Sequence, residues 1–209
     1  MSLNNLVKRL QDIMRNDAGV NGDAQRIEQM VWILFLKVYD AKEELWELHE
    51  DDYTSILPEE LRWRNWAVDY KDGQAMTGET LLKFVNETLF PTIKEEVDAS
   101  TPQRKAIVKY AFEDAYNYMK DGVLLRQVIN VIDEVDFTEN EERHAFNDIY
   151  ELILKDLQSQ RSSGEFYTPR PVTDFIVQVI KPQITDKIAD FACGTGGILT
   201  SALNYIEKQ

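Results

Sequence analysis

The chain has 209 residues, of which 44% are hydrophobic, and a formal net charge of −14 at pH 7. This length suits one or two domains with a buried core. No apolar run approaches the roughly 18 residues of a membrane span and no signal peptide opens the chain, so we expect a cytoplasmic protein without membrane contact. One cysteine and two histidines exclude an internal disulfide, and we expect no bound metal.

The acidic surplus is unevenly placed along the chain. Residues 161–209 carry five basic and five acidic side chains, so the whole surplus lies in residues 1–160. An acidic surface repels phosphates, and we therefore expect this chain to bind duplex DNA weakly by itself. The DNA has to be presented by another part of the protein or by a partner.

The first 50 residues predict two helices. Apolar residues at helical spacing form one stripe over residues 3–14, which is typical of an amphipathic helix. Asn21-Gly22-Asp23 then breaks the chain, and Asp23 is expected to cap a long second helix that runs through Val38. The acidic run from Glu43 to Asp52 is expected to mark its solvated end.

An irregular stretch follows between Tyr53 and Gly78, and it contains two tryptophans, Trp63 and Trp66, among arginines. Aromatic rings interleaved with arginines can stack on bases. The alternative is that the tryptophans fill the seams of a helical core. We favour the core because no wider basic field surrounds them.

Further helices follow in regular order, each with a start or stop signal. The first is expected from Thr77 or Gly78 through Leu89, with an interruption near Pro91. The second begins at Ser100 or Thr101 and has Ile107, Val108, Tyr110 and Ala111 on its apolar face. The third covers Val123–Val135, and the fourth runs from Thr138 through Leu157. The break between Gln158 and Gly164 is the best domain boundary. We place a helical domain at 1–160 and a second domain at 161–209.

A glycine-rich stretch lies near the carboxyl end. Residues 187–200 read as a short apolar strand that stops at Asp190, a loop with Gly194, Gly196 and Gly197, and the start of a helix. Glycines adopt positive φ and let the backbone approach a ligand, while the first N–H groups of a helix lack intrahelical acceptors. The stretch therefore predicts a cofactor loop at the end of a first parallel strand.

The spacing narrows the choice of cofactor. A dinucleotide fingerprint would place a third glycine at Leu199, and a phosphate-binding loop would need Gly-Lys-Ser/Thr; neither is present. The pattern Asp-x-x-x-Gly-x-Gly-Gly that begins at Asp190 resembles motif I of S-adenosylmethionine-dependent methyltransferases. This resemblance implies S-adenosylmethionine as the cofactor and no metal.

A second stretch sharpens the resemblance. Gly-Glu-Phe-Tyr-Thr-Pro-Arg at 164–170, followed by Asp-Phe-Ala-Cys-Gly-Thr-Gly-Gly at 190–197, resembles the modification subunit of type I restriction-modification systems. The resemblance implies that the cofactor is bound by Glu165, Phe166, Tyr167, Thr168, Pro169, Arg170, Asp190, Ala192, Gly194, Thr195, Gly196 and Gly197. From the residues alone, Glu165–Tyr167 could equally be a structural loop, Arg170 could flank a helix start, and Asp190 could be a helix-entry acid.

The resemblance also implies a fold and an activity. The fold is mainly α: a helical N-terminal domain followed by the truncated start of an α/β Rossmann-like methyltransferase domain. The activity of the complete subunit is methyl transfer to adenine N6 in DNA. Its implied partners are a DNA-specificity subunit, a restriction subunit, a second modification subunit and double-stranded DNA.

Part of the family pattern is missing. Methylation of an amino group in DNA needs a flipped base, and the family holds it with an Asn/Asp-Pro-Pro-aromatic motif, whereas no two prolines are adjacent here. We therefore expect an N-terminal fragment that has no catalytic residue and is inactive alone. The strand ending at Asp190 has no neighbours, so Ile184, Ile188, Ala189 and Phe191 are expected to lose burial. The alternative is a non-catalytic helical module that docks to partner subunits.

Overall fold

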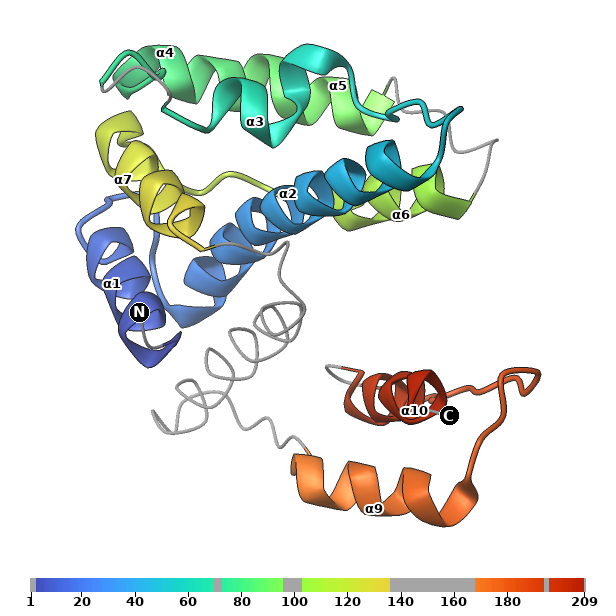
Figure 1. Ribbon diagram of the computed structural model, residues 1–209. Helices are drawn as coiled ribbons and strands as arrows, with labels where there is room; N and C mark the ends of the chain where they lie inside the picture. Colours follow the sequence, from blue (N-terminus) through green and yellow to red (C-terminus); the bar gives the residue numbers. More distant parts are fainter. Residues whose placement is uncertain (1–2, 70–72, 96–102, 136–167, 194–195, 209) are drawn as a thin grey trace. The chain divides into compact units, whose positions relative to one another are not determined.

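The computed structural model describes residues 3–69, 73–95, 103–135, 168–193 and 196–208 (Figure 1). The chain divides into two compact units, Met1–Leu157 and Gln158–Gln209. Across the described ranges all regular structure is helical, which confirms the mainly α fold class. The predicted domain boundary at residue 160 and the predicted helix from Thr138 to Leu157 lie outside the described residues, so both stay predictions.

Helix α1, Leu3–Met14, has the predicted bounds and buries the predicted stripe. The buried side chains on it are Leu6, Val7, Leu10 and Met14. This face packs against α7, Gly122–Asp133. The period of the apolar residues was therefore sufficient to find both the helix and its inner face.

Helix α2, Asp23–His49, is the long central helix of the first unit (Figure 1). Its start differs from the prediction, because Asp23 is the first helical residue and Gly22 is the cap, with φ 119° and no side-chain cap hydrogen bond. The chain enters the helix through a positive φ, which glycine adopts at little cost. A capping role for Asp23 is therefore wrong.

The end of α2 also corrects the prediction. The helix continues to His49, and Glu43 has no exposed surface. Its Oε1 accepts hydrogen bonds from the Tyr53 hydroxyl at 2.7 Å and the Ser55 hydroxyl at 2.6 Å. The acidic run is thus not simply a solvated helix end, because partners ten and twelve residues later allow its first carboxylate to be buried.

The tryptophans belong to the core, as we favoured. Trp63 and Trp66 begin and end the short helix α3, Trp63–Trp66, which follows a 3-10 turn, η1, Glu59–Leu61. They are 1% and 4% exposed, with ring centroids 5.5 Å apart. The Trp63 indole N–H donates to Asp133 at 2.8 Å and that of Trp66 to the Leu61 carbonyl at 3.1 Å.

The arginines beside the tryptophans pair with carboxylates of α2. Arg62 lies 2.9 Å from Glu47, and Arg64 lies 2.9 Å from Asp40 and 3.0 Å from Glu47. Both rings are almost fully buried and both guanidinium groups are paired with carboxylates, so neither residue type offers the exposed ring face or free cation that base stacking needs. The base-stacking alternative is therefore wrong.

Helix α4, Gly78–Lys83, continues through a π-helical segment, η2, Phe84–Leu89, into α5, Phe90–Glu95. The predicted interruption near Pro91 does not occur. Proline lacks an N–H and crowds the carbonyl four residues earlier, and a π turn directly before it widens the backbone. The inner face keeps a four-residue spacing through this segment, with Leu81, Val85, Leu89 and Ile93 all fully buried.

Helix α6, Gln103–Glu113, buries a different face from the one predicted. Val108 and Phe112 have no exposed surface, whereas Ile107 and Tyr110 are 55% and 68% exposed and Ala111 is exposed too. The predicted face contains Ile107 and Ala111, which are four positions apart, and the buried face contains Val108 and Phe112, which are also four positions apart. Both pairs fit the helical period, so the period alone does not choose between the two faces. Contacts with other helices decided between them.

Helix α7 begins at Gly122, one residue before the predicted start at Val123, and ends at Asp133, two residues before the predicted end. The Asp121 carboxylate accepts hydrogen bonds from the backbone N–H groups of Val123 and Leu124, which is an N-cap. Gly122 touches the backbone of Gly78 so closely that an added Cβ would lie 1.8 Å from the Gly78 carbonyl oxygen. The contact between α4 and α7 therefore depends on the absence of a side chain.

The second unit contains α9, Arg170–Ile180, packed against α10, Gly197–Glu207. Residues 187–190 form no strand, contrary to the prediction, because a strand needs a hydrogen-bonded neighbour and the described ranges offer none. As expected, the apolar side chains around them are exposed: Ile184 by 86%, Ile188 by 42% and Phe191 fully. No described helix is long and apolar enough to cross a membrane.

Candidate cofactor site

The turn into α10 has the geometry expected of a ligand-binding loop. Gly196 precedes the helix with φ 72° and ψ 24°, a left-handed conformation that favours glycine. Its N–H donates to the Cys193 carbonyl at 2.7 Å. Gly197 is already helical, so of the described glycines in the loop it is Gly196 that needs the positive φ.

The amino end of α10 has no side-chain cap. The first hydrogen bond along the helix runs from the Thr200 N–H to the Gly196 carbonyl at 2.8 Å. The N–H groups of Gly197, Ile198 and Leu199 precede it and have no intrahelical acceptor. Such an end attracts carboxylates, hydroxyls and other acceptors of a ligand.

Asp190 shapes the approach to this loop. Its Oδ1 accepts a hydrogen bond from the Ala192 N–H at 3.1 Å, and the residue is half-buried. An aspartate that bonds the N–H two residues on forms a compact turn. Asp190 lies seven positions before Gly197, the first residue of α10, so it is not a helix-entry acid of that helix.

Arg170 joins the two sequence stretches. Its Nη1 donates to the carbonyl of Gly197 at 2.9 Å, across 27 residues of chain. Thr168 and Pro169 directly precede it and are exposed, and Pro169 is the cap residue of α9. The structure thus places the Thr-Pro-Arg segment beside the start of α10.

Five of the predicted cofactor residues lie outside the described ranges: Glu165, Phe166, Tyr167, Gly194 and Thr195. The structure brings together Thr168, Pro169 and Arg170 with Gly197 through the Arg170 hydrogen bond. Whether these residues bind a cofactor stays a prediction. Among the described residues, no group of three or more His, Cys, Asp or Glu side chains gathers as a metal site.

Sequence reasoning missed three polar side chains between α9 and α10. Thr173 and Ser201, 0% and 4% exposed, have hydroxyl oxygens 2.9 Å apart, and Ser201 donates to Asp174 at 2.7 Å. A threonine or serine on the apolar face of a helix, such as Thr173 or Ser201, is a sequence pattern that predicts such a contact, because a buried hydroxyl needs a hydrogen-bond partner.

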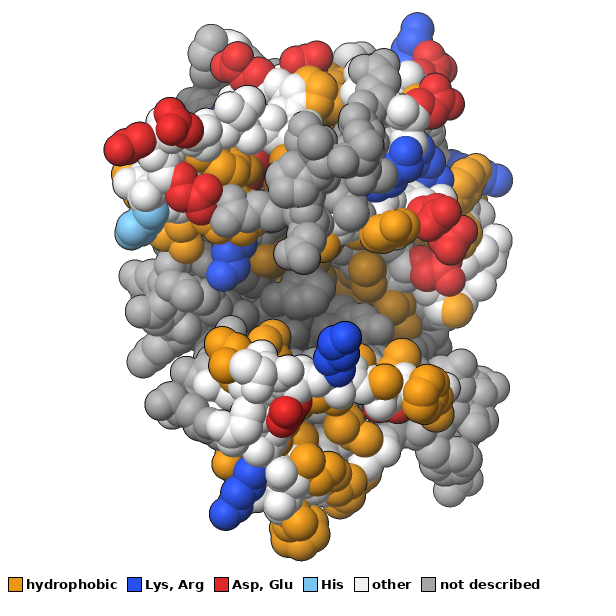
Figure 2. All heavy atoms as spheres, turned by 90° about the vertical axis from the view of Figure 1, so that its right-hand side faces the viewer, with side chains coloured by type: hydrophobic (Ala, Val, Ile, Leu, Met, Phe, Trp, Pro, Cys, Tyr) orange, Lys and Arg blue, Asp and Glu red, His pale blue; other side chains and the backbone are white. Residues whose placement is uncertain are grey.

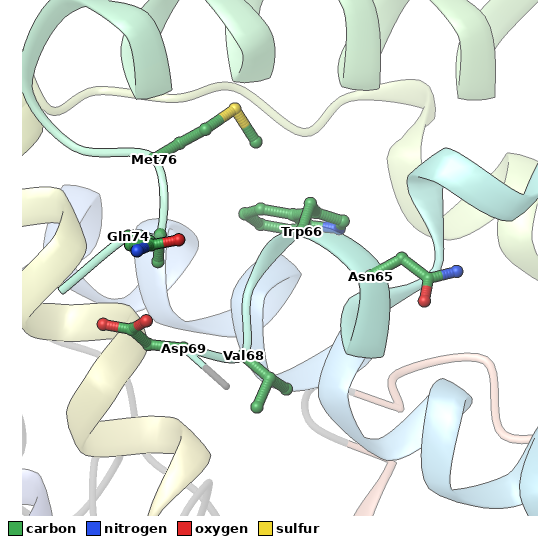
Figure 3. Close-up of a pocket in the computed structure, with 7 residues that line it drawn as sticks. Asn65, Trp66, Val68, Asp69, Gln74 and Met76 are labelled. Atoms are coloured by element: carbon green, nitrogen blue, oxygen red, sulfur yellow. The ribbon is translucent and has the colours of Figure 1, made fainter. Parts of the chain in front are cut away.

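A surface pocket of about 280 Å³ lies on the first unit (Figure 3). Its lining residues are Asn65, Trp66, Val68, Asp69, Gln74, Ala75 and Met76. The buried Arg126 donates to the carbonyls of Ala67 at 2.6 Å and Met76 at 2.7 Å and so ties two segments of this lining together. Burial lowers the pKa of Arg126. None of the predicted cofactor residues lines this pocket.

Two family models match the chain in succession. The HsdM N-terminal domain matches residues 3–132 and N-6 DNA Methylase matches residues 141–209. The chain therefore belongs to the HsdM family, the modification subunits of type I restriction enzymes. This confirms the resemblance drawn from the two motifs.

The relatives agree with this assignment. Over its full length the chain is 52% identical to the type I restriction enzyme EcoEI methylase subunit of Escherichia coli and 26% identical to the StySJI methylase subunit of Salmonella typhimurium. It covers 42% and 36% of those proteins. The chain thus spans less than half the length of these curated relatives.

Solved structures are similar as well. A modification subunit of a putative type I restriction enzyme from Vibrio vulnificus YJ016 matches with a TM-score of 0.85 and 33% identity, covering 99% of this chain and 46% of that one. A chain from a study of complex assembly and conformational transition of the type I R-M system matches with a TM-score of 0.75 and 32% identity, covering 99% and 41%.

Proposed function

We propose that this chain is the N-terminal part of a modification subunit that transfers a methyl group from S-adenosylmethionine to adenine N6 in DNA. The observation that carries the proposal is the Arg170 hydrogen bond to Gly197, which brings the Thr-Pro-Arg segment to the glycine loop. Both family models and the EcoEI relative support it. The glycine loop falls within the segment that matches N-6 DNA Methylase.

The described residues fit such a cofactor. A Cβ at Gly196 would meet nothing within 4 Å, so the backbone there is open, and the uncapped end of α10 offers N–H donors. When bound, the cofactor supplies an electrophilic methyl group. The proposed cofactor residues are Glu165, Phe166, Tyr167, Thr168, Pro169, Arg170, Asp190, Ala192, Gly194, Thr195, Gly196 and Gly197.

The chain's own residues are proposed to bind and orient, and none of them to catalyse. Adenine methylation needs a base held outside the duplex, and the Asn/Asp-Pro-Pro-aromatic motif expected for that task is absent from this sequence. The chain alone is therefore expected to transfer no methyl group. A DNA-specificity subunit, a restriction subunit and a second modification subunit are the proposed partners, in line with the type I R-M assembly that the chain resembles.

The test is S-adenosylmethionine binding by the intact subunit, measured by titration calorimetry. Asp190→Asn keeps an acceptor oxygen but removes the negative charge, and it is expected to weaken binding of the cationic cofactor by roughly tenfold, the effect of replacing a charge-assisted contact with a neutral one. Asp186→Asn is the matched control, because Asp186 is an exposed acid four residues earlier. An intact subunit that does not bind S-adenosylmethionine would contradict the proposal and favour a non-catalytic docking module.

A further inference from the structure

Two buried hydroxyls, those of Thr173 and Ser201, and the exposed carboxylate of Asp174 form a polar link between α9 and α10. Ser201 donates its single hydroxyl hydrogen to Asp174 Oδ1 at 2.7 Å. Because that hydrogen is used, the 2.9 Å contact between the two hydroxyls needs Thr173 as donor. Thr173 Oγ1 also lies 2.9 Å from the Arg170 carbonyl, so its hydrogen is shared between two acceptors.

The link lies one helical turn behind the proposed cofactor site. Thr173 follows Arg170 by three residues on α9, and Ser201 follows Gly197 by four on α10. Arg170 and Gly197 are themselves joined by the 2.9 Å hydrogen bond. The two helices are therefore tied at successive turns, first at their starts and then at the buried hydroxyls.

The helices also approach closely between these ties. A Cβ on Gly197 would lie 3.6 Å from the Thr173 methyl group, which is ordinary van der Waals contact. In the described part of this unit, the fully or nearly buried apolar side chains are those of Val177, Pro182 and Ala202. The hydrogen bonds of Thr173 and Ser201 are directional, so they restrict how α9 and α10 lie against each other more narrowly than apolar contact alone would.

We propose that Thr173, Ser201 and Asp174 are positioning residues for S-adenosylmethionine binding. They hold the start of α10, with its free N–H groups, opposite residues 168–170, so that both stretches meet one ligand without reorganisation. A site held in its bound geometry loses less free energy on binding than one that must be ordered. This inference rests on the proposed function, since it concerns the same cofactor.

The experiment compares two changes at one position in the intact subunit, assembled with its partners. Thr173→Val keeps the shape and removes the hydroxyl, whereas Thr173→Ser keeps the hydroxyl and removes the methyl group. Thr173→Val should raise the KM and the Kd for S-adenosylmethionine roughly three- to tenfold, the effect of one lost buried hydrogen bond. The kcat at saturating cofactor should not change, and Thr173→Ser should behave as wild type.

Ser201→Ala is the second variant and should reproduce Thr173→Val. In the double variant Thr173→Val/Ser201→Ala, the increase in Kd should be smaller than the product of the two single increases, because both changes break the same hydrogen-bond network. Thr80→Val, at an exposed position on α4, controls for the substitution itself. The Tm of every variant, measured by thermal unfolding, gives the fraction of folded protein at the assay temperature, and the binding data are corrected for that fraction.

The outcomes are separable. Equal weakening by Thr173→Val and Thr173→Ser would overturn the inference, because packing and not the hydroxyl would then matter. Loss of kcat with an unchanged KM and a lower Tm would overturn it too, as a purely structural role predicts. If the wild type binds S-adenosylmethionine and Thr173→Val binds it with the same affinity, only the positioning role is overturned. If the wild type does not bind S-adenosylmethionine, the proposed function and the inference are both overturned.

Discussion

The two units differ in how their helices are held together. The first unit has a hydrophobic core built from every described helix between α1 and α7, with residues such as Leu10, Ile33 and Ile93 fully buried. The described part of the second unit has two helices and little apolar burial, and Phe175, Val179 and Ile180 of α9 are 64–67% exposed. In Figure 2 hydrophobic side chains gather on the second unit in the lower part of the view, whereas acidic side chains are spread over the first.

The difference teaches where stability and where ligand geometry come from. Burial of a large apolar side chain is worth roughly 1.5–3 kcal/mol, so the first unit is stabilised by its own core. In the described part of the second unit, polar contacts such as Arg170 to Gly197 join the two helices. These contacts fix a geometry more than they add stability, because a net hydrogen bond contributes only about 1 kcal/mol. The following changes test the contrast.

The largest effect is expected for Gly122→Ala in the first unit. The new Cβ would lie 1.8 Å from the Gly78 carbonyl oxygen and 2.4 Å from its carbon, and a backbone contact cannot be relieved by a rotamer change. We expect a loss of about 4 kcal/mol or more in the free energy of unfolding. Urea unfolding followed by tryptophan fluorescence measures it, since all four tryptophans lie in this unit.

Gln127→Ala, at an exposed position on the same helix, is the control and should lie within about 0.5 kcal/mol of wild type. If Gly122→Ala unfolded at the same urea concentration as this control, α4 and α7 would have room to separate. The close contact between them would then not be a requirement of the fold.

The second test compares one substitution in both units. Phe112→Ala removes a ring with no exposed surface, whereas Phe175→Ala removes one that is 65% exposed. We expect the first to cost about 3–4 kcal/mol and the second to change stability by less than about 0.5 kcal/mol. Hydrogen exchange of the two units, measured by mass spectrometry, reports each effect where it occurs. Similar costs at both positions would contradict the contrast.

The third test concerns two adjacent glycines. Gly196→Ala forces a side chain into a backbone with φ 72°, which costs about 1–2 kcal/mol, so S-adenosylmethionine binding by the intact subunit should weaken roughly five- to thirtyfold. Gly197→Ala is the matched control for the backbone, because its Cβ would meet the Thr173 methyl at an ordinary 3.6 Å. Weakening by Gly197→Ala alone would show that ligand approach, not φ, selects the glycines.

The smallest effect is a pH dependence in the first unit. Burial raises the pKa of Asp40 above its usual range, although Arg64 opposes the shift and Glu44 and Glu43 add to it. The folded state therefore holds this proton more tightly than the unfolded state. The stability that protonation gives is present below the ordinary aspartate pKa of about 3.9 and is lost as pH rises through the folded pKa.

Asp40→Asn removes this titration, although it also weakens the contact with Arg64 at every pH. The free energy of unfolding of wild type minus that of the variant should thus fall as pH rises from about 4 through the window above it. Urea titrations at a series of pH values measure the slope. A difference that rises with pH would mean that the Arg64 ion pair outweighs burial.

The sequence by itself determined the local features. The apolar period placed α1 and its inner face, the predicted helix over Val123–Val135 lies within two residues of α7 at each end, and the glycine spacing identified the loop before α10. Two short motifs were sufficient to find the family, since backbone conformation and ligand approach restrict the residue type at each position. Such signals depend on residues near one another in the chain.

Only the tertiary structure decided the features that depend on distant partners. Glu43 is buried because Tyr53 and Ser55 reach its carboxylate, and α6 turns Val108 inward rather than Ile107 because of the helices around it. The hydroxyl link from Thr173 to Ser201 spans 28 residues, and nothing local specifies it. Most buried polar side chains have a hydrogen-bond partner, and for Glu43, Thr173 and Ser201 that partner is supplied by packing in three dimensions.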